Sequence, residues 1–195
     1  MRVSGWAVVA AVGAVLALGA CNRSKSTAEA PAPATKAAPA ALTGFQHEAG
    51  FDAQGYYRSE SAVQSGAFKL DHIAMGAPSD FQTWEGGARD AMFGPIWFHF
   101  DDVSSPKATN ELGQENHTVA VRVLPTSYRM GPGKVAFRGS DARVGEVTFE
   151  GAFDTAALAQ ARASGSSDGK PVLKGALQVG GVRASEISFG YWAGD

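Results

Sequence analysis

The sequence predicts an all-β fold, an antiparallel sandwich or small barrel of about eight strands with one or two short helices. Apolar and polar residues alternate over several segments, which is the period-two pattern of half-buried strands. The chain of 195 residues contains 24 Gly and 9 Pro, so turns are expected to be frequent. Near the C-terminus, Gly180-Gly181 separates two apolar runs and matches the two-residue connection of a β-hairpin.

The strands are predicted in order along the chain. The apolar run at 96–100 is the first clear strand, and a second opens at Val119 with alternating valines. Gly131-Pro132-Gly133 predicts a turn, 135–137 a short strand and 139–141 a further turn. Residues 146–153 alternate again, 164–169 are expected to form a flexible loop, and 172–179 with 182–192 form the terminal hairpin.

Two short helices are expected beside these strands. Ser79 with Gln82 three residues later is a capping-box pattern that opens a helix over 80–85, closed by Gly86-Gly87. Asp154 or Thr155 can cap a second helix over 156–163, which is rich in Ala and Leu.

The N-terminal segment has the features of a secretory signal. An apolar stretch follows Arg2 and ends in Leu18-Gly19-Ala20-Cys21, which resembles the lipobox of bacterial lipoproteins. The resemblance implies that residues 1–20 are a signal peptide and that Cys21, after cleavage, carries diacylglycerol and fatty acid such as palmitate. A transmembrane anchor over 3–20 is the alternative, although no basic stop-transfer cluster follows it directly.

Residues 21–43 are expected to be the lipidated cysteine followed by a disordered Ala/Pro-rich tether, because such a composition buries too little apolar surface to offset ordering entropy. Residues 44–195 are expected to form a single β-rich domain. Asn22, rather than Asp, follows the cysteine, which resembles the sorting pattern of outer-membrane lipoproteins. The expected location is therefore the bacterial cell envelope, on the periplasmic leaflet of the outer membrane.

Composition limits the partners and the chemistry. A formal net charge of -2 offers no broad basic surface, so we expect no nucleic acid partner. Cys21 is the only cysteine, so a lipidated protein has no disulfide and no catalytic thiol. Serine-nucleophile and phosphate-loop motifs are also missing from the sequence. We expect no cofactor.

A polar segment between two apolar strands is the candidate binding loop, because a rigid scaffold can position its side chains. Trp97 is included because it alternates with core positions, so that it either is buried beneath a loop or helix or points outward beside His99 as part of a contact surface. The candidate residues are Trp97, His99, Asp101, Asp102, Asn110, Glu111, Glu115 and His117.

A cation is the alternative occupant of this loop. Oxygen ligands suit Ca²⁺, and the candidate set is Asp101, Asp102, Glu111 and Glu115, although their spacing matches no EF-hand. The four histidines lie too far apart in the sequence to predict a zinc site.

These observations favour a membrane-anchored, non-enzymatic binding module that captures a protein or another envelope component, an immunity or inhibitor lipoprotein being one concrete form. Two alternatives remain open. One is a barrel that carries an apolar ligand such as a lipid, which requires a large interior cavity. The other is a hydrolase with an unfamiliar site at His99, Asp101 and His117, which requires these side chains to converge.

Overall fold

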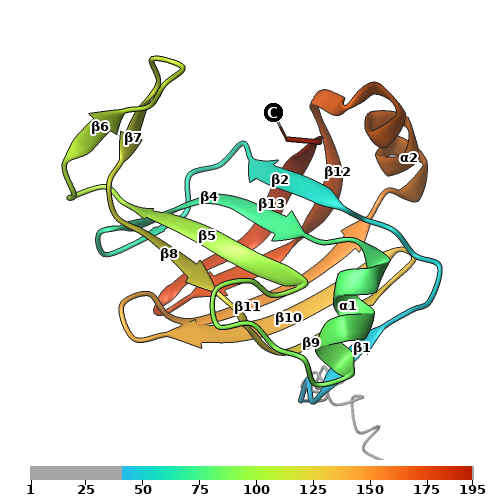
Figure 1. Ribbon diagram of the computed structural model, residues 1–195. Helices are drawn as coiled ribbons and strands as arrows, with labels where there is room; N and C mark the ends of the chain where they lie inside the picture. Colours follow the sequence, from blue (N-terminus) through green and yellow to red (C-terminus); the bar gives the residue numbers. More distant parts are fainter. Residues whose placement is uncertain (1–40, 195) are drawn as a thin grey trace, which may run out of the picture. The chain divides into compact units, whose positions relative to one another are not determined.

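Eleven strands join into one curled sheet that forms a half-barrel in residues 41–194, the part of the chain that the computed structural model describes (Figure 1). The signal peptide, Cys21 and most of the expected tether lie outside the described residues. The strands of the sheet are β1 (Phe45–His47), β2 (Gly55–Ser59), β3 (Gln64–Ser65), β4 (Phe68–Met75), β5 (Ile96–Asp102), β8 (Ala120–Val123), β9 (Pro125–Gly131), β10 (Lys134–Asp141), β11 (Gly145–Phe153), β12 (Ser166–Val179) and β13 (Val182–Trp192).

The order of strands in the sheet is β1-β9-β10-β11-β12-β13-β2-β4-β5-β8, with β3 paired to β4 outside this path. Neighbours are antiparallel except β1 and β9, which are parallel. Leu124 alone separates β8, at one end of the path, from β9, near the other end. This short connection joins the two ends of the curled sheet and brings β8 into contact with β10.

The concave side of the sheet is filled by aromatic rings. Phe98 of β5 lies 4.7 Å from Phe137 of β10 and 5.9 Å from Phe149 of β11, measured between ring centroids. Phe149 in turn lies 5.6 Å from Phe189 of β13. All four side chains are almost completely buried, so the strand alternation predicted from the sequence has its apolar side in this core.

Helix α1 (Pro78–Glu85) packs near β1, at the lower end of the sheet in Figure 1. Pro78 occupies the first helical position, and the Asp80 carboxylate accepts a hydrogen bond of 2.8 Å from the Ala77 backbone N–H. Phe81 and Trp84 bury the apolar side of the helix, 5.4 Å from Tyr128 and 6.1 Å from Phe45 respectively.

Helix α2 (Thr155–Ser164) packs against β12 and β13. The Asp154 carboxylate caps its first turn by accepting a 2.9 Å hydrogen bond from the Ala157 N–H, as the sequence predicted. Gly165 ends the helix with φ of 82°, a conformation that glycine adopts without strain. In the described part of the chain, no helix is long and apolar enough to cross a membrane.

The all-β fold class and the Gly180-Gly181 hairpin are confirmed. Several details are wrong. The sheet has eleven strands rather than about eight, because β9 and the strands before residue 75 were not predicted individually. The first helix begins at Pro78, and Asp80 rather than Ser79 supplies its cap hydrogen bond.

Two predicted turns or loops are strand. Gly139, predicted in a turn, lies inside β10, where the register against β9 shifts. A Cβ there would collide with the Leu124 carbonyl and the Phe137 ring, so this glycine permits close packing of backbone rather than a reversal. The expected loop at 164–169 is largely the start of β12, which begins at Ser166 and pairs there with Trp192.

A stability test follows from the paired glycines Gly151 and Gly175, which face each other across β11 and β12 beneath the Phe149 ring. A Cβ on Gly175 would lie 2.8 Å from that ring and 2.7 Å from the Gly151 Cα. We expect Gly175→Ala to lower the free energy of unfolding by about 1–3 kcal/mol, measured by urea denaturation. Gly181→Ala, whose Cβ would meet nothing within 4 Å, is the control and should stay near wild type. Equal midpoints for the two variants would contradict this packing.

Candidate functional site

The polar segment after β5 folds into a hairpin rather than a loop. β6 (Lys107–Thr109) and β7 (Glu115–His117) pair in a separate two-stranded sheet, which projects at the upper left of Figure 1. Asn110 holds its turn, because its Oδ1 accepts hydrogen bonds from the backbone N–H groups of Leu112 at 3.0 Å and Gln114 at 2.9 Å. Asn110, Glu111 and Glu115 of the candidate loop therefore belong to this hairpin.

The adjacent carboxylates Asp101 and Asp102 have different partners. Asp102 accepts hydrogen bonds from the backbone N–H and the hydroxyl of Ser104, and these bonds hold the pKa of the Asp102 carboxyl below its ordinary value. Asp101 instead lies 3.5 Å from the His99 Nε2. Nδ1 of His117 lies 3.2 Å from the Ser105 carbonyl oxygen, and no contact in the described structure links His117 to the His99–Asp101 pair.

The four carboxylates considered for calcium are likewise dispersed. Glu115 lies 3.7 Å from the Lys107 Nζ, across the hairpin. Within residues 41–194, no group of three or more His, Cys, Asp and Glu side chains is placed to hold a metal ion.

A β-bulge in β4 brings several titratable side chains together on the surface. Leu70 pairs with Phe100 and His72 pairs with His99, so Asp71 is an extra residue in β4. Leu70 and Ile73 are both buried in the core. They lie three positions apart, so regular alternation would place them on opposite faces of the sheet. Asp71 and His72, which a regular strand would place on opposite faces, therefore both lie on the outer face.

Two imidazole rings stack on this outer face. The His72 and His99 centroids are 4.7 Å apart with an interplanar angle of 9°, and Asp71 Oδ2 lies 2.6 Å from the His72 Nδ1. We call His72, His99, Asp71 and Asp101 the histidine stack. It was not predicted as a unit, because His72 was not among the candidate residues. The odd spacing between apolar Leu70 and Ile73 is the sequence signal that could have indicated it.

The charges in the stack are coupled. The hydrogen bond with His72 lowers the pKa of the Asp71 carboxyl. Burial lowers the pKa of His99, and the positive charge of His72 lowers it further. His99 therefore stays neutral at pH values where an ordinary imidazole takes up a proton.

Aromatic and cationic side chains of β2 and β13 continue this outer surface. Tyr56 lies edge-on to His72 with centroids 5.2 Å apart and is also 5.2 Å from the Trp192 ring. The Arg58 guanidinium lies 4.4 Å from the Trp192 ring centroid and 4.0 Å from the Asp71 carboxylate. Tyr56 also borders a groove, so the stack and the groove form one continuous surface.

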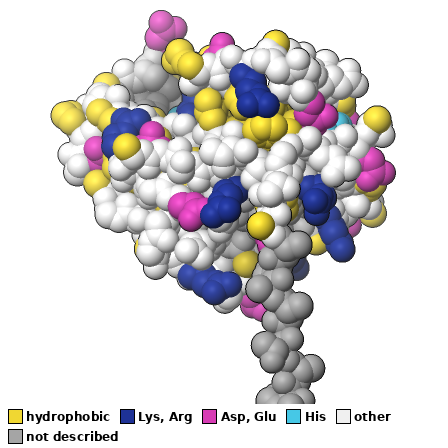
Figure 2. Space-filling view, turned by 90° about the horizontal axis from the view of Figure 1, so that it is seen from below, with side chains coloured by type: hydrophobic (Ala, Val, Ile, Leu, Met, Phe, Trp, Pro, Cys, Tyr) yellow, Lys and Arg dark blue, Asp and Glu magenta, His cyan; other side chains and the backbone are white. Residues whose placement is uncertain are grey.

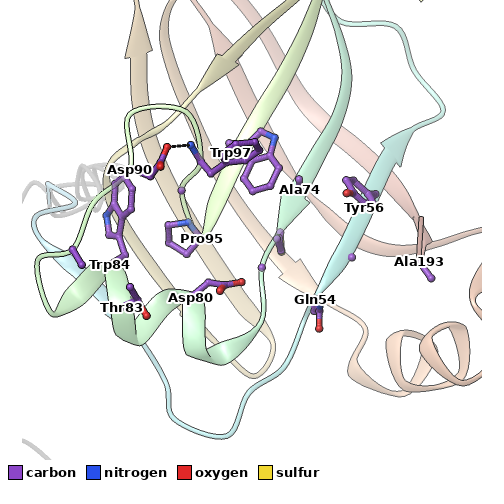
Figure 3. Close-up of a pocket in the computed structure, with 16 residues that line it drawn as sticks. Gln54, Tyr56, Ala74, Asp80, Thr83, Trp84, Asp90, Pro95, Trp97 and Ala193 are labelled. Atoms are coloured by element: carbon purple, nitrogen blue, oxygen red, sulfur yellow. Dashed lines mark hydrogen bonds between the residues drawn. The ribbon is translucent and has the colours of Figure 1, made fainter. Parts of the chain in front are cut away.

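The groove lies between α1, the segment 86–95 and the ends of β2, β4 and β5 (Figure 3). Its volume is about 460 Å³, which is within the range of roughly 300–1,000 Å³ common for small-molecule sites. No Lys or Arg side chain lines it. The aromatic and polar side chains that line it are Tyr56, Trp84, Phe93, Trp97, Gln54, Asp80, Thr83 and Asp90.

Local sequence explains the wall formed by segment 86–95. Gly86-Gly87 ends α1, with φ of 95° at Gly87. Asp90 then folds the segment, because its Oδ1 accepts hydrogen bonds from the backbone N–H groups of Met92 at 2.6 Å and Phe93 at 3.0 Å. Figure 3 shows a hydrogen bond beside Asp90. Phe93 is half exposed and packs edge-on against Trp97, with centroids 6.0 Å apart.

Two indole nitrogens at the groove lack hydrogen-bond partners. Nε1 of Trp84 and Nε1 of Trp97 are both covered, and neither has an acceptor within the described structure. A buried donor without a partner costs about 1–3 kcal/mol, so each such group needs an explanation. Of the eight candidate residues from the sequence, only Trp97 lines the groove, on the outer face.

A second mixed patch lies beside α1. The Arg89 guanidinium lies 4.4 Å from the Phe45 ring centroid and 5.8 Å from that of Trp84. Seen from below, the molecule presents mostly uncharged surface, with hydrophobic side chains gathered around a basic one (Figure 2). Arginine over an aromatic ring is a favourable contact that keeps this apolar surface partly covered.

No family model matches the chain, and the searches of curated proteins and of solved structures found no match.

The coupling within the histidine stack gives a direct test by NMR. His72→Gln removes the neighbouring cation and part of the cover over His99, so the pKa of His99 should rise toward the ordinary imidazole value of 6.5. Imidazole carbon and proton shifts followed against pH measure this. Leu112→Ala, at the remote hairpin tip, is the control. An unchanged His99 titration in His72→Gln would show that the rings are not coupled.

The same pKa shift affects stability. The unfolded chain takes up a proton at His99 at higher pH than the folded chain does, so this contribution to stability is present above about pH 6.5 and is lost as the pH falls through the folded pKa of His99. His99→Gln should therefore flatten the decrease in urea midpoint between neutral and mildly acidic pH. A decrease as steep as in the wild type would assign the pH dependence to other groups.

Proposed function

We propose that the protein is a lipid-anchored lipoprotein of the bacterial envelope whose β-rich domain is a non-enzymatic binding module, with the groove beside α1 as its binding site. The observation that carries this proposal is the lining of the groove, which combines four aromatic side chains with a small number of polar ones in an open cleft. Binding sites for small ligands have this composition.

The alternatives receive less support. An apolar-ligand carrier needs an interior cavity, whereas the side of the sheet that would hold it is packed with phenylalanine rings. A hydrolase at His99, Asp101 and His117 needs these residues to converge, whereas His117 contacts Ser105 in the hairpin region. No histidine or cysteine lines the groove. Thr83 does line it, and its hydroxyl donates a hydrogen bond to the Ser79 carbonyl oxygen.

The anchor is proposed from the lipobox resemblance at Leu18-Gly19-Ala20-Cys21. On this proposal the lipid on Cys21 holds the domain at the periplasmic leaflet of the outer membrane, and the Ala/Pro-rich segment serves as the tether. On the same proposal, the groove binds an envelope component that lies within reach of the tethered domain.

Anchoring predicts that Cys21→Ser abolishes labelling by radioactive palmitate and moves the protein out of the membrane fraction. Asn22→Asp is the matched variant, since it keeps the acylated cysteine and alters only the residue of the sorting pattern. It should remain labelled but shift toward the inner membrane on a density gradient. Retention of Cys21→Ser in the membrane pellet after alkaline wash would instead support the transmembrane anchor over residues 3–20.

Binding at the groove predicts site-dependent photo-crosslinking in living cells. A benzoyl-phenylalanine at position 93, half exposed at the groove, should form a discrete adduct with an envelope component that mass spectrometry identifies. The same photo-probe at position 112, which is 73% exposed at the hairpin tip, is the control and should form none. Adducts from position 112 alone would place the binding surface on the hairpin, and the absence of any adduct at position 93 would refute the proposal.

A further inference from the structure

The charge of the groove restricts its ligand. Its ionisable lining consists of the carboxylates Asp80 and Asp90, with no lysine or arginine among the lining residues. A phosphate or carboxylate ligand would meet two like charges in the groove, whereas the guanidinium groups of Arg89 and Arg122 are already engaged, 5.8 Å from the Trp84 ring centroid and 4.6 Å from that of Phe93. Anionic ligands are therefore disfavoured, and a neutral or cationic one fits.

The aromatic side chains supply apolar faces. Tyr56, Phe93 and Trp97 are partly exposed and come from three different segments, β2, the segment 86–95 and β5. Figure 3 shows Tyr56 and Trp97 on either side of Ala74. Ala74 itself is buried, so the two rings and not the alanine form this part of the surface. A ligand with flat apolar faces can pack against these rings.

The hydrogen-bonding groups include both acceptors and donors. Asp80 uses Oδ2 to accept from Ala77, and Asp90 uses Oδ1 to accept from Met92 and Phe93, so each carboxylate keeps its second oxygen with no recorded partner in the described structure. The Tyr56 hydroxyl and the Gln54 side-chain amide are further groups that can donate.

The indole nitrogens of Trp84 and Trp97 distinguish a neutral ligand from a cation. A cation offers donors only and would leave both N–H groups without acceptors, whereas hydroxyl and ring oxygens can accept from them. Both nitrogens are covered, so a ligand oxygen reaches them only after a lining side chain moves. Phe93, half exposed and packed against Trp97, is one such side chain.

We propose that the groove binds a neutral saccharide, a ligand that presents hydroxyl donors, oxygen acceptors and apolar C–H faces together. This inference rests on the proposed function, because it names the ligand class of the same site. The carboxylates accept from sugar hydroxyls, the indole and amide groups donate to sugar oxygens, and the aromatic rings pack against the sugar ring.

Tryptophan fluorescence gives a direct test, because Trp84 and Trp97 line the groove and only Trp192 accompanies them once residues 1–20 are cleaved. The full-length lipidated protein in detergent is titrated separately with cellotetraose, maltotetraose and chitotetraose up to ~10 mM, and calorimetry measures the same Kd. We expect a saturable change with at least one of them. Tetragalacturonate, an anionic oligosaccharide of similar size, should bind at least roughly tenfold more weakly.

Variants separate the contributions of the site. Trp97→Ala should weaken binding roughly tenfold by removing the ring, and Trp97→Phe, which keeps a ring and loses the N–H, should weaken it less. Asp80 and Asp90 support local structure, so they are left unchanged. Leu112→Ala is the control and should bind as the wild type. Near-ultraviolet circular dichroism checks that each variant is folded.

The outcomes distinguish this inference from the proposed function. Saturable binding of a neutral saccharide that Trp97→Ala weakens supports it. If no neutral saccharide binds while the photo-probe at position 93 traps another component, the saccharide inference is wrong and the binding module stands. Saturation by spermine alone would make the groove a cation site and would also overturn the inference. Absence of both saccharide binding and adducts would refute both proposals.

Discussion

The filling of the curled sheet by phenylalanine rings is the constraint on which the rest of the molecule depends. Phe98, Phe137, Phe149 and Phe189 occupy the concave side and contact each other across strands that are distant in the sequence. Gly175 leaves the space that the Phe149 ring uses, so the backbone and the rings fit together. Because the concave side is occupied by the protein's own side chains, the exposed surface of the sheet lies on its convex face and at its rim.

A single extra residue then determines the chemistry of the convex face. The bulge at Asp71 shifts the alternation of β4, so that Leu70 and Ile73 stay in the core while Asp71 and His72 both face outward. A regular strand would bury one of these two polar side chains at the expense of desolvation. The bulge avoids that cost and places His72 over His99, whose pKa is lowered by burial and by the charge of His72.

Local patterns in the sequence predicted the elements that depend on local physics. Alternating valines gave β8, Gly180-Gly181 gave the terminal hairpin, and Asp154 gave the cap of α2. What failed depends on contacts between distant segments. Glycine is typical of turns, but at position 139 the missing side chain permits close packing against Leu124, fifteen positions earlier in the sequence. The groove could not be read from the sequence either, because β2, α1, segment 86–95 and β5 meet there only after the sheet has curled.

The composition of the convex face supports the proposed binding function. Solvated sheet faces are commonly polar, and aromatic pairs across strands stabilise a sheet by only roughly 0.2–1 kcal/mol each. Here Tyr56 covers His72 and contacts Trp192, and Arg58 lies over that same indole. These rings add little to the hydrophobic core, because they lie on the face of the sheet opposite to the phenylalanine cluster. They form a partly exposed surface that runs into the groove at Tyr56. On the proposed function this surface continues the binding site, because aromatic rings held in place by their neighbours lower the entropy cost of binding.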